Sequence, residues 1–365
     1  MRLRGVLLRL QTERQGWWSG YGSPLMHSPR SGILAGGNFI VDYVKTVTHY
    51  PEENMLTIIR AESMANGGGP YNVLKDLSAL ECGFPLEAAG LVGADVNGSW
   101  ILEDCRSHRI DTTQLHRTEL APTSYTDAMT VESTGRRTFF HQPGANALLD
   151  KHHFDFSTTR TRIFHFGYLM LLPTLDSISV VDERTGASHV LEAARAAGLE
   201  TSMDLVSIEH PDYSKIVRGT LPFVDHLIIN EIEAGKIVGR PLDPEDVAGV
   251  LEATAEILSF GVGKSVVLHF EAGATAIERG QDAIACPSLA LPAGFSKGST
   301  GAGDAFAAGY LYALHEGWTL EARLDLAVCT AAACLTHPTP SAGVRPVQEC
   351  LLLGKRFERR QMGSR

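Results

Sequence analysis

Short apolar segments alternate with longer segments of helical periodicity through most of this chain. Strand-like runs are expected at 33–39, 86–93, 161–168, 201–206, 225–230 and 264–270. Between them, the spacing of apolar residues predicts helices over 70–83, 97–108, 186–197 and 244–260. Strands that alternate with helices form βαβ units and a mostly parallel sheet. The sequence therefore predicts an α/β protein.

Two regions interrupt this alternation. Residues 40–64 and 121–142 are rich in β-branched and polar residues and show no helical period. They predict hairpins that belong to a second, smaller β-sheet inserted on the α/β body. Such a sheet could act as a lid that excludes water from a site. Ordinary surface hairpins account for the same pattern equally well.

The bulk composition excludes several classes of partner. The 365 residues carry a formal net charge of −10, and an acidic surface without a basic patch argues against nucleic acid. No apolar run approaches the roughly 18 residues needed to span a membrane. The six cysteines form no C-x-x-C pair, so a zinc site is not expected. Scattered single cysteines favour a reducing, cytoplasmic location.

Both ends of the chain are expected to lie outside the folded domain. Residues 1–30 are basic and lack the apolar core of a secretory signal, so we expect a disordered extension. Residues 351–365 are expected to form a polar tail. A single domain would then span residues 31–350, which is long enough to bury a large core.

A loop of small residues precedes an apolar helix near the end of the chain. The sequence STGAGDAFAAGYLYAL spans 299–314, and Asp304 stands where loop and helix meet. The backbone N–H groups of Gly301, Ala302 and Gly303 would lie uncovered at a positive helix end, which favours an anion. Asp304 could accept the proton of a hydroxyl that attacks phosphorus, or it could cap the helix. The residues of this stretch do not distinguish the two roles.

Several stretches along the chain resemble the PfkB (ribokinase-like) family of carbohydrate kinases. The glycine loop is similar to the C-terminal signature of that family, and further stretches match in the family's order from about residue 32 to residue 345. They are GGNFIVD (36–42), NGGGPYN (66–72), LVGADVNG (91–98), PGANALL (143–149) and NEIEAGKIVG (230–239). The resemblance implies a three-layer α/β/α sandwich with a mostly parallel central sheet and a small β-sheet lid.

The resemblance also implies an activity, namely transfer of the γ-phosphate of ATP to a hydroxyl group of a sugar or sugar-like small molecule, with Mg²⁺. It implies that Asp304 is the catalytic base and that the amides of Gly301, Ala302 and Gly303 form an anion hole. An aspartate with an ordinary pKa suffices as this base, because the hydroxyl loses its proton late in the reaction. The residues implied to bind the acceptor are Asp42, Gly67, Gly68, Gly69 and Asn72. Those implied near the nucleotide are Asn230, Glu233, Gly273 and Thr300.

Asn230 and Glu233 are further implied to hold Mg²⁺, largely through water, because this hard cation sheds its hydration shell reluctantly. Their N-x-x-E spacing is equally a common helix start, in which the two side chains cap the first turn. The glycines of 67–69 could likewise be only a flexible turn before the helix at 70–83.

The chain departs from the family pattern at three places. Gly298 stands where the family usually has an aspartate, which in some members helps to hold a monovalent cation, so a requirement for such a cation is left open. In the strand expected over 266–277, Leu268, His269 and Phe270 replace the family's T-x-G, which leaves the phosphate contacts of that strand open. Pro70 and Tyr71 replace a lysine and a glycine, so ribose itself is not assigned as the acceptor.

Two other functions remain as alternatives. A nucleoside kinase of the same family would use lid aromatics to stack on a base, and the candidates are Tyr43, Tyr125, Phe139 and Phe140. A non-catalytic sugar-binding or regulatory protein with a degraded ATP site would explain the departures at 298 and 268–270. A nicotinamide oxidoreductase is disfavoured because no G-x-G-x-x-G follows the first strand. We also expect that lid strands of two subunits can pair to form a homodimer.

Overall fold

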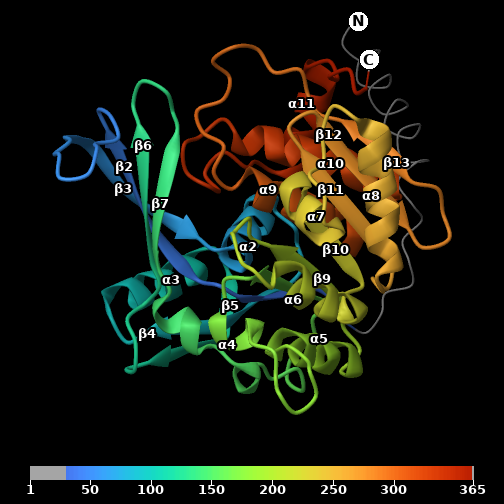
Figure 1. The fold of residues 1–365 in the computed structure, drawn as a ribbon, viewed down its shortest axis with the longest axis horizontal. Coiled ribbons are helices and arrows are strands. Elements are labelled where there is room, and N and C mark those ends of the chain that lie inside the picture. Colours follow the sequence, from blue (N-terminus) through green and yellow to red (C-terminus); the bar gives the residue numbers. More distant parts are fainter. Residues whose placement is uncertain (1–29, 364–365) are drawn as a thin grey trace, which may run out of the picture.

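A nine-stranded sheet forms the centre of the molecule in the computed structural model, which describes residues 30–363 (Figure 1). Its order is β13 (Ile284–Pro287), β12 (Gly273–Glu278), β11 (Ser265–Phe270), β10 (His226–Asn230), β9 (Glu200–Leu205), β8 (Ile163–Leu169), β1 (Ile33–Gly37), β4 (Leu86–Gly93) and β5 (Ile110–Thr118). The strands from β11 to β5 are parallel, and β12 and β13 pair antiparallel at one edge. The predicted α/β fold is confirmed. The predicted extension over 1–30 lies, except for Arg30, outside the described residues.

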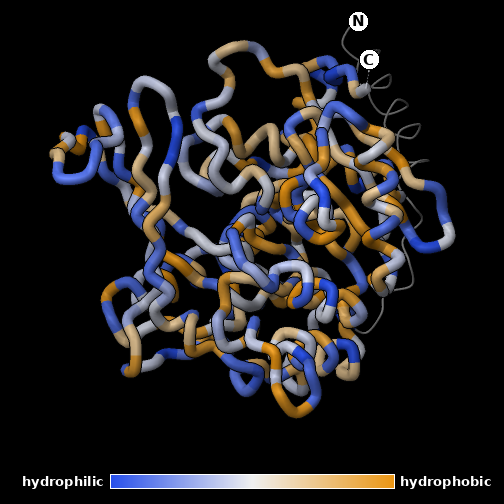
Figure 2. Tube along the Cα trace, viewed as in Figure 1, coloured by the Kyte–Doolittle hydropathy of each residue, from blue (hydrophilic) through white to orange (hydrophobic). Residues whose placement is uncertain are grey.

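Helices cover both faces of the sheet. Successive side chains of a strand point to opposite faces, so each strand contributes apolar side chains to two cores. Ile33 and Ala35 of β1 belong to one core and Leu34 to the other, and Figure 2 shows the hydrophobic segments concentrated in this body. The first core contains α2 (Gly69–Ala79), α3 (Val96–Ser107), α9 (Ala302–His315), α10 (Leu320–Cys334) and α11 (Val347–Arg356). The second contains α4 (Pro173–Asp176), α5 (Gly186–Ala196), α6 (Tyr213–Thr220), α7 (Glu231–Val238), α8 (Val247–Ser259) and the short 3₁₀ helices η1 (Gly144–Leu148) and η3 (Leu221–Phe223). A third 3₁₀ helix, η2, spans Lys151–His153.

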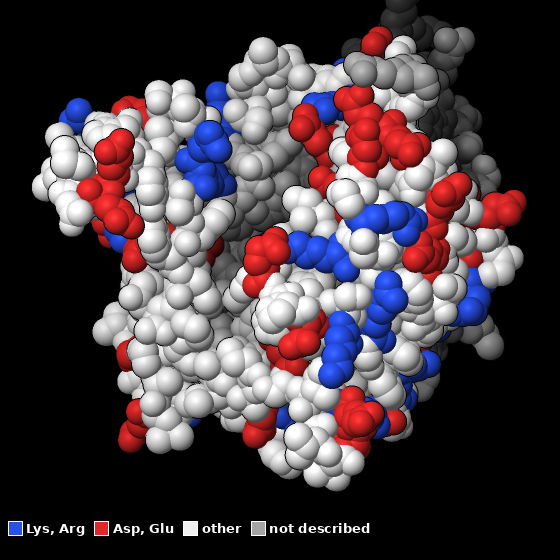
Figure 3. Space-filling view, viewed as in Figure 1, with Lys and Arg blue, Asp and Glu red and all other residues white. Residues whose placement is uncertain are grey.

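A second sheet of four strands stands beside this body as a lid. Its order is β3 (Ile59–Gly67), β2 (Ile40–Val47), β6 (Tyr125–Val131) and β7 (Arg137–Gln142). Two antiparallel hairpins, β2–β3 and β6–β7, are joined by parallel pairing of β2 with β6. Figure 3 shows the molecule hollowed between the lid and the body. The predicted smaller sheet is therefore confirmed, and it borders a cleft.

The described C-terminal residues continue from α11 along the edge of the central sheet. Arg359 forms an ion pair with Asp325 of α10, and the backbone N–H of Arg360 donates to the carbonyl of Ser288 at 2.8 Å. The part of the predicted polar tail up to Arg356 is helical. Within residues 30–363, none of the helices has the length and apolar character required to cross a membrane.

Asp76 of α2 is a fully buried acid. Neither of its carboxylate oxygens receives a well-formed hydrogen bond from the described residues, and burial raises the pKa of Asp76 well above its usual range. An acid with a raised folded-state pKa stabilises the fold at low pH, and this stability is lost as the pH rises toward that pKa.

We therefore expect Asp76→Asn to increase the free energy of unfolding by about 1–3 kcal/mol near pH 8 and to change it little near pH 4, because the neutral amide avoids a buried charge. Urea unfolding of both proteins at the two pH values measures the difference. A variant that is less stable than the parent at the higher pH would show that the ionised carboxylate has a favourable partner.

Candidate active site

Helix α9 begins at the glycine loop, in a turn that only glycine fits. Gly301 has a left-handed conformation with φ of 78°, and a Cβ atom there would lie 2.6 Å from the Cα of Pro340. Any side chain would therefore have to move the backbone of one of the two loops. The residues from Asp304 to Leu311 are all buried, which holds the first turn of α9 against the body.

Backbone amides at this helix start are free to bind an anion. No hydrogen bond joins the N–H groups of Gly301, Gly303 or Asp304 to another residue within 30–363, whereas Ala302 donates to the carbonyl of Ser299 at 3.3 Å. Unpartnered N–H groups at a positive helix end are a favourable anion site. Of the three predicted donors, Gly301 and Gly303 are available in this geometry, and the N–H of Ala302 is already engaged.

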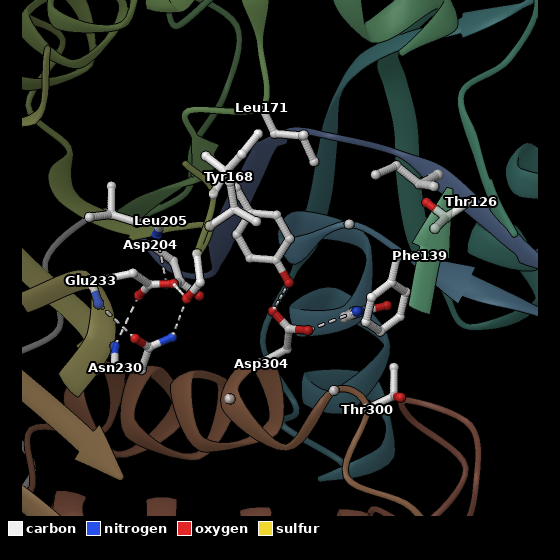
Figure 4. A pocket seen from close by; sticks show the side chains of 18 of the residues that line it. Thr126, Phe139, Tyr168, Leu171, Asp204, Leu205, Asn230, Glu233, Thr300 and Asp304 are labelled. Atoms are coloured by element: carbon white, nitrogen blue, oxygen red, sulfur yellow. Dashed lines mark hydrogen bonds between the residues drawn. The ribbon is translucent and has the colours of Figure 1, made fainter. Parts of the chain in front are cut away.

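The Asp304 carboxylate is held by side chains from two other elements (Figure 4). The Tyr168 hydroxyl, near the end of β8, donates to Oδ1 at 2.6 Å. The Nδ2 group of Asn72, on α2, donates to Oδ2 at 2.8 Å. Both contacts are tertiary, and neither oxygen accepts a backbone N–H from the described part of α9. These contacts differ from those of a helix-capping acid.

The pKa of Asp304 differs from the ordinary value expected from the sequence. Burial raises the pKa of Asp304 to about 6, and the hydrogen bonds from Tyr168 and Asn72 limit the rise because they stabilise the ionised form. Asn72 is itself fixed, because its Oδ1 accepts a hydrogen bond from Nδ2 of Asn66 at 2.7 Å. The group is thus an oriented carboxylate with a pKa close to the range where a general base works best.

The predicted acceptor residues lie between α9 and the lid. Asp42 of β2, Gly68 and Asn72 line a cavity of about 600 Å³ together with Asp304. A Cβ at Gly67 would lie 2.3 Å from Oδ1 of Asp42, and a Cβ at Gly69 would lie 2.8 Å from the Tyr168 ring. Burial, and then the charge of Asp304, raises the pKa of Asp42 to about 7. The structure therefore brings Asp42, Gly68 and Asn72 together around the cavity, with Gly67 packed against Asp42 and Gly69 against Tyr168.

Asn230 and Glu233 form a capping box at the start of α7. The backbone N–H of Glu233 donates to Oδ1 of Asn230 at 2.9 Å, and the N–H of Asn230 donates to Oε2 of Glu233 at 3.0 Å. Both residues line the cavity that contains Asp304, together with Asp204 from the end of β9. Burial raises the pKa of Asp204 and of Glu233, and the Glu233 charge adds to the rise at Asp204.

This arrangement fits a hydrated Mg²⁺. Two mutually repelling carboxylates and an amide oxygen offer the hard oxygen ligands that Mg²⁺ prefers. Among the described residues, no cluster of three or more His, Cys, Asp or Glu side chains could enclose a metal ion. A cation at Asp204 and Glu233 would therefore complete its coordination with water and with ligand oxygens, as Mg²⁺ commonly does.

A second cavity of about 830 Å³ adjoins the first and has room for a nucleotide. It contains the predicted residue Gly273 and shares Asn230, His269 and Gly303 with the first cavity. His269 belongs to the segment 268–270, which departs from the family pattern. Burial lowers the pKa of His269 to about 4, and its ring packs on Phe306 at a centroid distance of 5.0 Å. A neutral imidazole therefore occupies the wall between the two cavities.

A Cβ at Gly298 would lie 2.9 Å from an Nη atom of Arg137, so a guanidinium lies beside this glycine. Of the aromatics, Phe139 lines the first cavity. Tyr43 and Tyr125 pack edge to face against each other at 5.9 Å.

The lining of the first cavity includes polar residues that were not predicted from the sequence, among them Tyr168, Asp204 and His141. Tyr168 and Asp204 stand next to last in β8 and β9. The rule that ligands bind at the carboxyl ends of parallel strands could have marked them. His141 lies in a lid strand, and only the strand pairing shows that it faces the cavity.

Comparison with known proteins gives a family match over most of the chain. A sequence model described as pfkB family carbohydrate kinase matches residues 33–346. A ribokinase from Arabidopsis thaliana is 24% identical over 325 residues, which cover 85% of this chain and 76% of that protein.

Solved structures share the fold. The Arabidopsis thaliana ribokinase complexed with ribose and ATP aligns with a TM-score of 0.71 and 20% identity, over 89% of this chain and 98% of that one. A nucleoside kinase from Methanocaldococcus jannaschii aligns with a TM-score of 0.68 and 19% identity, over 92% of this chain and 100% of that one. At these identities the structural likeness is evidence for the fold alone.

Proposed function

This chain belongs to the pfkB family of carbohydrate kinases, and we propose that it transfers the γ-phosphate of ATP to a hydroxyl group of a sugar or sugar-like small molecule. One observation carries the proposal. The oriented Asp304 carboxylate and the unpartnered amides of Gly301 and Gly303 lie at the same wall of one cavity. A base and an anion site side by side are what phosphoryl transfer to an alcohol requires.

In this mechanism Asp304 binds the acceptor hydroxyl and accepts its proton as the oxygen attacks phosphorus. Because Tyr168 and Asn72 fix the carboxylate, the hydroxyl is oriented before reaction, which is the main contribution that a protein makes to this chemistry. The free amides stabilise the negative charge on the oxygens of the transferred group.

The opposite side of the cavity would hold the metal. Asp204 and Glu233 would bind Mg²⁺, with Asn230 orienting Glu233 through the capping box. When bound, the ion neutralises charge on the phosphate oxygens. The second cavity, with Gly273, would take the rest of the nucleotide.

A nucleoside acceptor is the second candidate. Phe139 is the lid aromatic that lines the first cavity, and a ring in this place could stack on a base. A ribose moiety would present the same kind of hydroxyl to Asp304, so the same residues serve both acceptors.

An assay of acceptor-dependent ADP release tests the function. The protein is incubated with ATP, Mg²⁺ and single members of a panel of pentoses, hexoses, polyols and nucleosides. We expect one class to stimulate ADP release well above the rate with ATP alone and to yield a phosphorylated product. ATP binding without stimulation by any class would favour the non-catalytic, sugar-binding alternative.

Tyr168→Phe is expected to shift the acid limb of the pH–rate profile upward by about one pH unit. The base must be ionised, so the rate falls as the pH drops through the pKa of Asp304, which is about 6. Loss of the Tyr168 hydrogen bond destabilises the carboxylate and raises this pKa, and about 1.4 kcal/mol corresponds to one unit. Profiles of kcat/KM between about pH 5 and pH 8 measure the shift.

Tyr71→Phe is the matched control, because the Tyr71 hydroxyl also donates to a carboxylate, that of Asp104, but outside the cavity. Its acid limb should coincide with that of the parent. Identical limbs for the Tyr168 variant and the parent would contradict the assignment of Asp304 as the titrating base.

A further inference from the structure

The inner face of the lid places a row of three polar side chains over the first cavity. Asp42 of β2 is directly opposite Thr126 of β6, and Thr126 is opposite His141 of β7. Residues in such a row point to the same side of the sheet. All three line the cavity that contains Asp304.

The row is linked by hydrogen bonds that end at one unused nitrogen atom. Thr126 interacts with the Asp42 carboxylate, and its Oγ1 lies 3.0 Å from Nδ1 of His141. The other ring nitrogen of His141, Nε2, is buried and has no hydrogen-bond partner among the described residues. A buried polar atom without a partner is uncommon and costs about 1–3 kcal/mol. A ligand that supplies the missing partner would remove this cost.

The surrounding charges define the kind of group that fits. Burial lowers the pKa of His141, so the imidazole is neutral near pH 7 and can donate or accept a hydrogen bond but not attract an anion. The cavity lining contains four carboxyl groups, from Asp42, Asp204, Glu233 and Asp304, and includes no Lys or Arg among the described residues. Arg137 acts on Asp42 as a nearby positive charge but does not line the cavity, so a carboxylate or phosphate on the acceptor would meet four acids against one cation. A neutral hydroxyl group meets no such penalty.

We propose that His141 is a specificity-determining residue whose Nε2 binds a second hydroxyl group of the acceptor, separate from the hydroxyl that faces Asp304. The acceptor class that fits this hydroxyl-binding group is a neutral polyol, either a free sugar or the sugar of a nucleoside. This inference rests on the proposed function for the identity of the first cavity as the acceptor site.

Two substitutions of His141 separate ligand binding from support of the lid. The polar end of an asparagine side chain reaches the place of Nδ1, so His141→Asn keeps a partner for Thr126 and removes the group at Nε2. The glutamine side chain reaches the place of Nε2, so His141→Gln keeps a hydrogen-bonding atom toward the ligand. If His141 only supports Thr126, the asparagine variant should resemble the parent more closely. If His141 binds the acceptor, the glutamine variant should resemble the parent more closely.

Acceptor binding is measured by calorimetry with D-ribose, D-fructose, myo-inositol and adenosine in the presence of a non-hydrolysable ATP analogue. For the probe that binds best, we expect His141→Asn to weaken binding about 10- to 100-fold, as for loss of one buried hydrogen bond. His141→Gln should stay within about threefold of the parent. In turnover assays the loss should appear in the KM of the acceptor, with the KM of ATP unchanged.

Singly deoxygenated analogues of the same probe identify the hydroxyl. One analogue should bind the parent as weakly as the intact probe binds His141→Asn. Combining this analogue with the His141→Asn variant should weaken binding no more than either change alone. Equal binding by parent and His141→Asn, or a glutamine variant as weak as the asparagine variant, would overturn the inference. Because binding is measured without turnover, the role of His141 and the proposed function are tested separately. Binding that depends on His141 without phosphate transfer would overturn the proposed function and support the role of His141.

Discussion

Replacement of Asp304 by asparagine is expected to lower kcat by about 10²–10⁴-fold, the usual contribution of a positioned general base. The amide is nearly isosteric with the carboxylate, and its oxygen can still accept one of the hydrogen bonds that Tyr168 and Asn72 donate. It cannot accept the proton of an acceptor hydroxyl at neutral pH. The loss should therefore appear in the chemical step, with ATP affinity retained.

The experiment combines single-turnover phosphoryl transfer with calorimetric titration of ATP. Asp95→Asn provides the control, because Asp95 caps α3 through a hydrogen bond from the N–H of Gly98 at 2.8 Å and does not line the cavity. It should lower stability slightly and leave the rate unchanged. If Asp304→Asn behaved like this control, with a small stability loss and normal turnover, Asp304 would not be the base.

The fold was predictable where the sequence pattern reports burial directly. Parallel strands covered on both faces read as continuous apolar runs, and the predicted runs at 86–93 and 225–230 correspond to β4 and β10. The run at 264–270 likewise corresponds to β11, but the longer strand expected over 266–277 is in fact two strands, because the chain turns after Phe270 and returns as β12. Both halves are apolar, and the turn at Glu271 and Ala272 carries no strong turn dipeptide, so the pattern gave no sign of the reversal.

The candidate site was predictable where its residues are local in the sequence. Asp304 and its glycines are adjacent, and Asn72 follows its own glycine run. The partners that orient Asp304 are remote, since Tyr168 is separated from it by 136 positions. Even Asn72, which was predicted to bind the acceptor, contacts Asp304 directly. Contacts of this kind depend on how β8, α2 and α9 pack together, which a single sequence does not specify.

The site also joins two roles that the sequence presents as alternatives. Asn230 and Glu233 have the spacing of a helix cap and of a family motif, and the structure has the complete capping box. The same box turns the Glu233 carboxyl toward Ser207, whose hydroxyl donates to Oε1 at 2.8 Å. Capping therefore fixes the orientation of a cavity-lining acid, so the structural role supports the proposed binding of Mg²⁺.

Gly301→Ala is expected to lower kcat by about 10²–10³-fold, comparable to the loss of one donor from an anion hole. Two costs combine at this position. The left-handed φ of 78° costs a non-glycine residue about 1–2 kcal/mol, and the new Cβ would lie 2.6 Å from Pro340. Relief of that contact moves the loop, and with it the amides of Gly301 and Gly303, away from the phosphoryl group. Single-turnover transfer at saturating ATP measures the effect.

Gly280→Ala separates backbone strain from this displacement. Gly280 has a similar φ of 85°, but no atom lies within 4 Å of the place where its Cβ would stand, and it lies in the turn between β12 and β13. This control should lose about 1–2 kcal/mol of stability from the left-handed conformation and keep its full rate. Equal rates for the two variants would mean that the position of the Gly301 loop does not govern transfer. A rate loss confined to Gly301→Ala would tie catalysis to the amides that this turn presents.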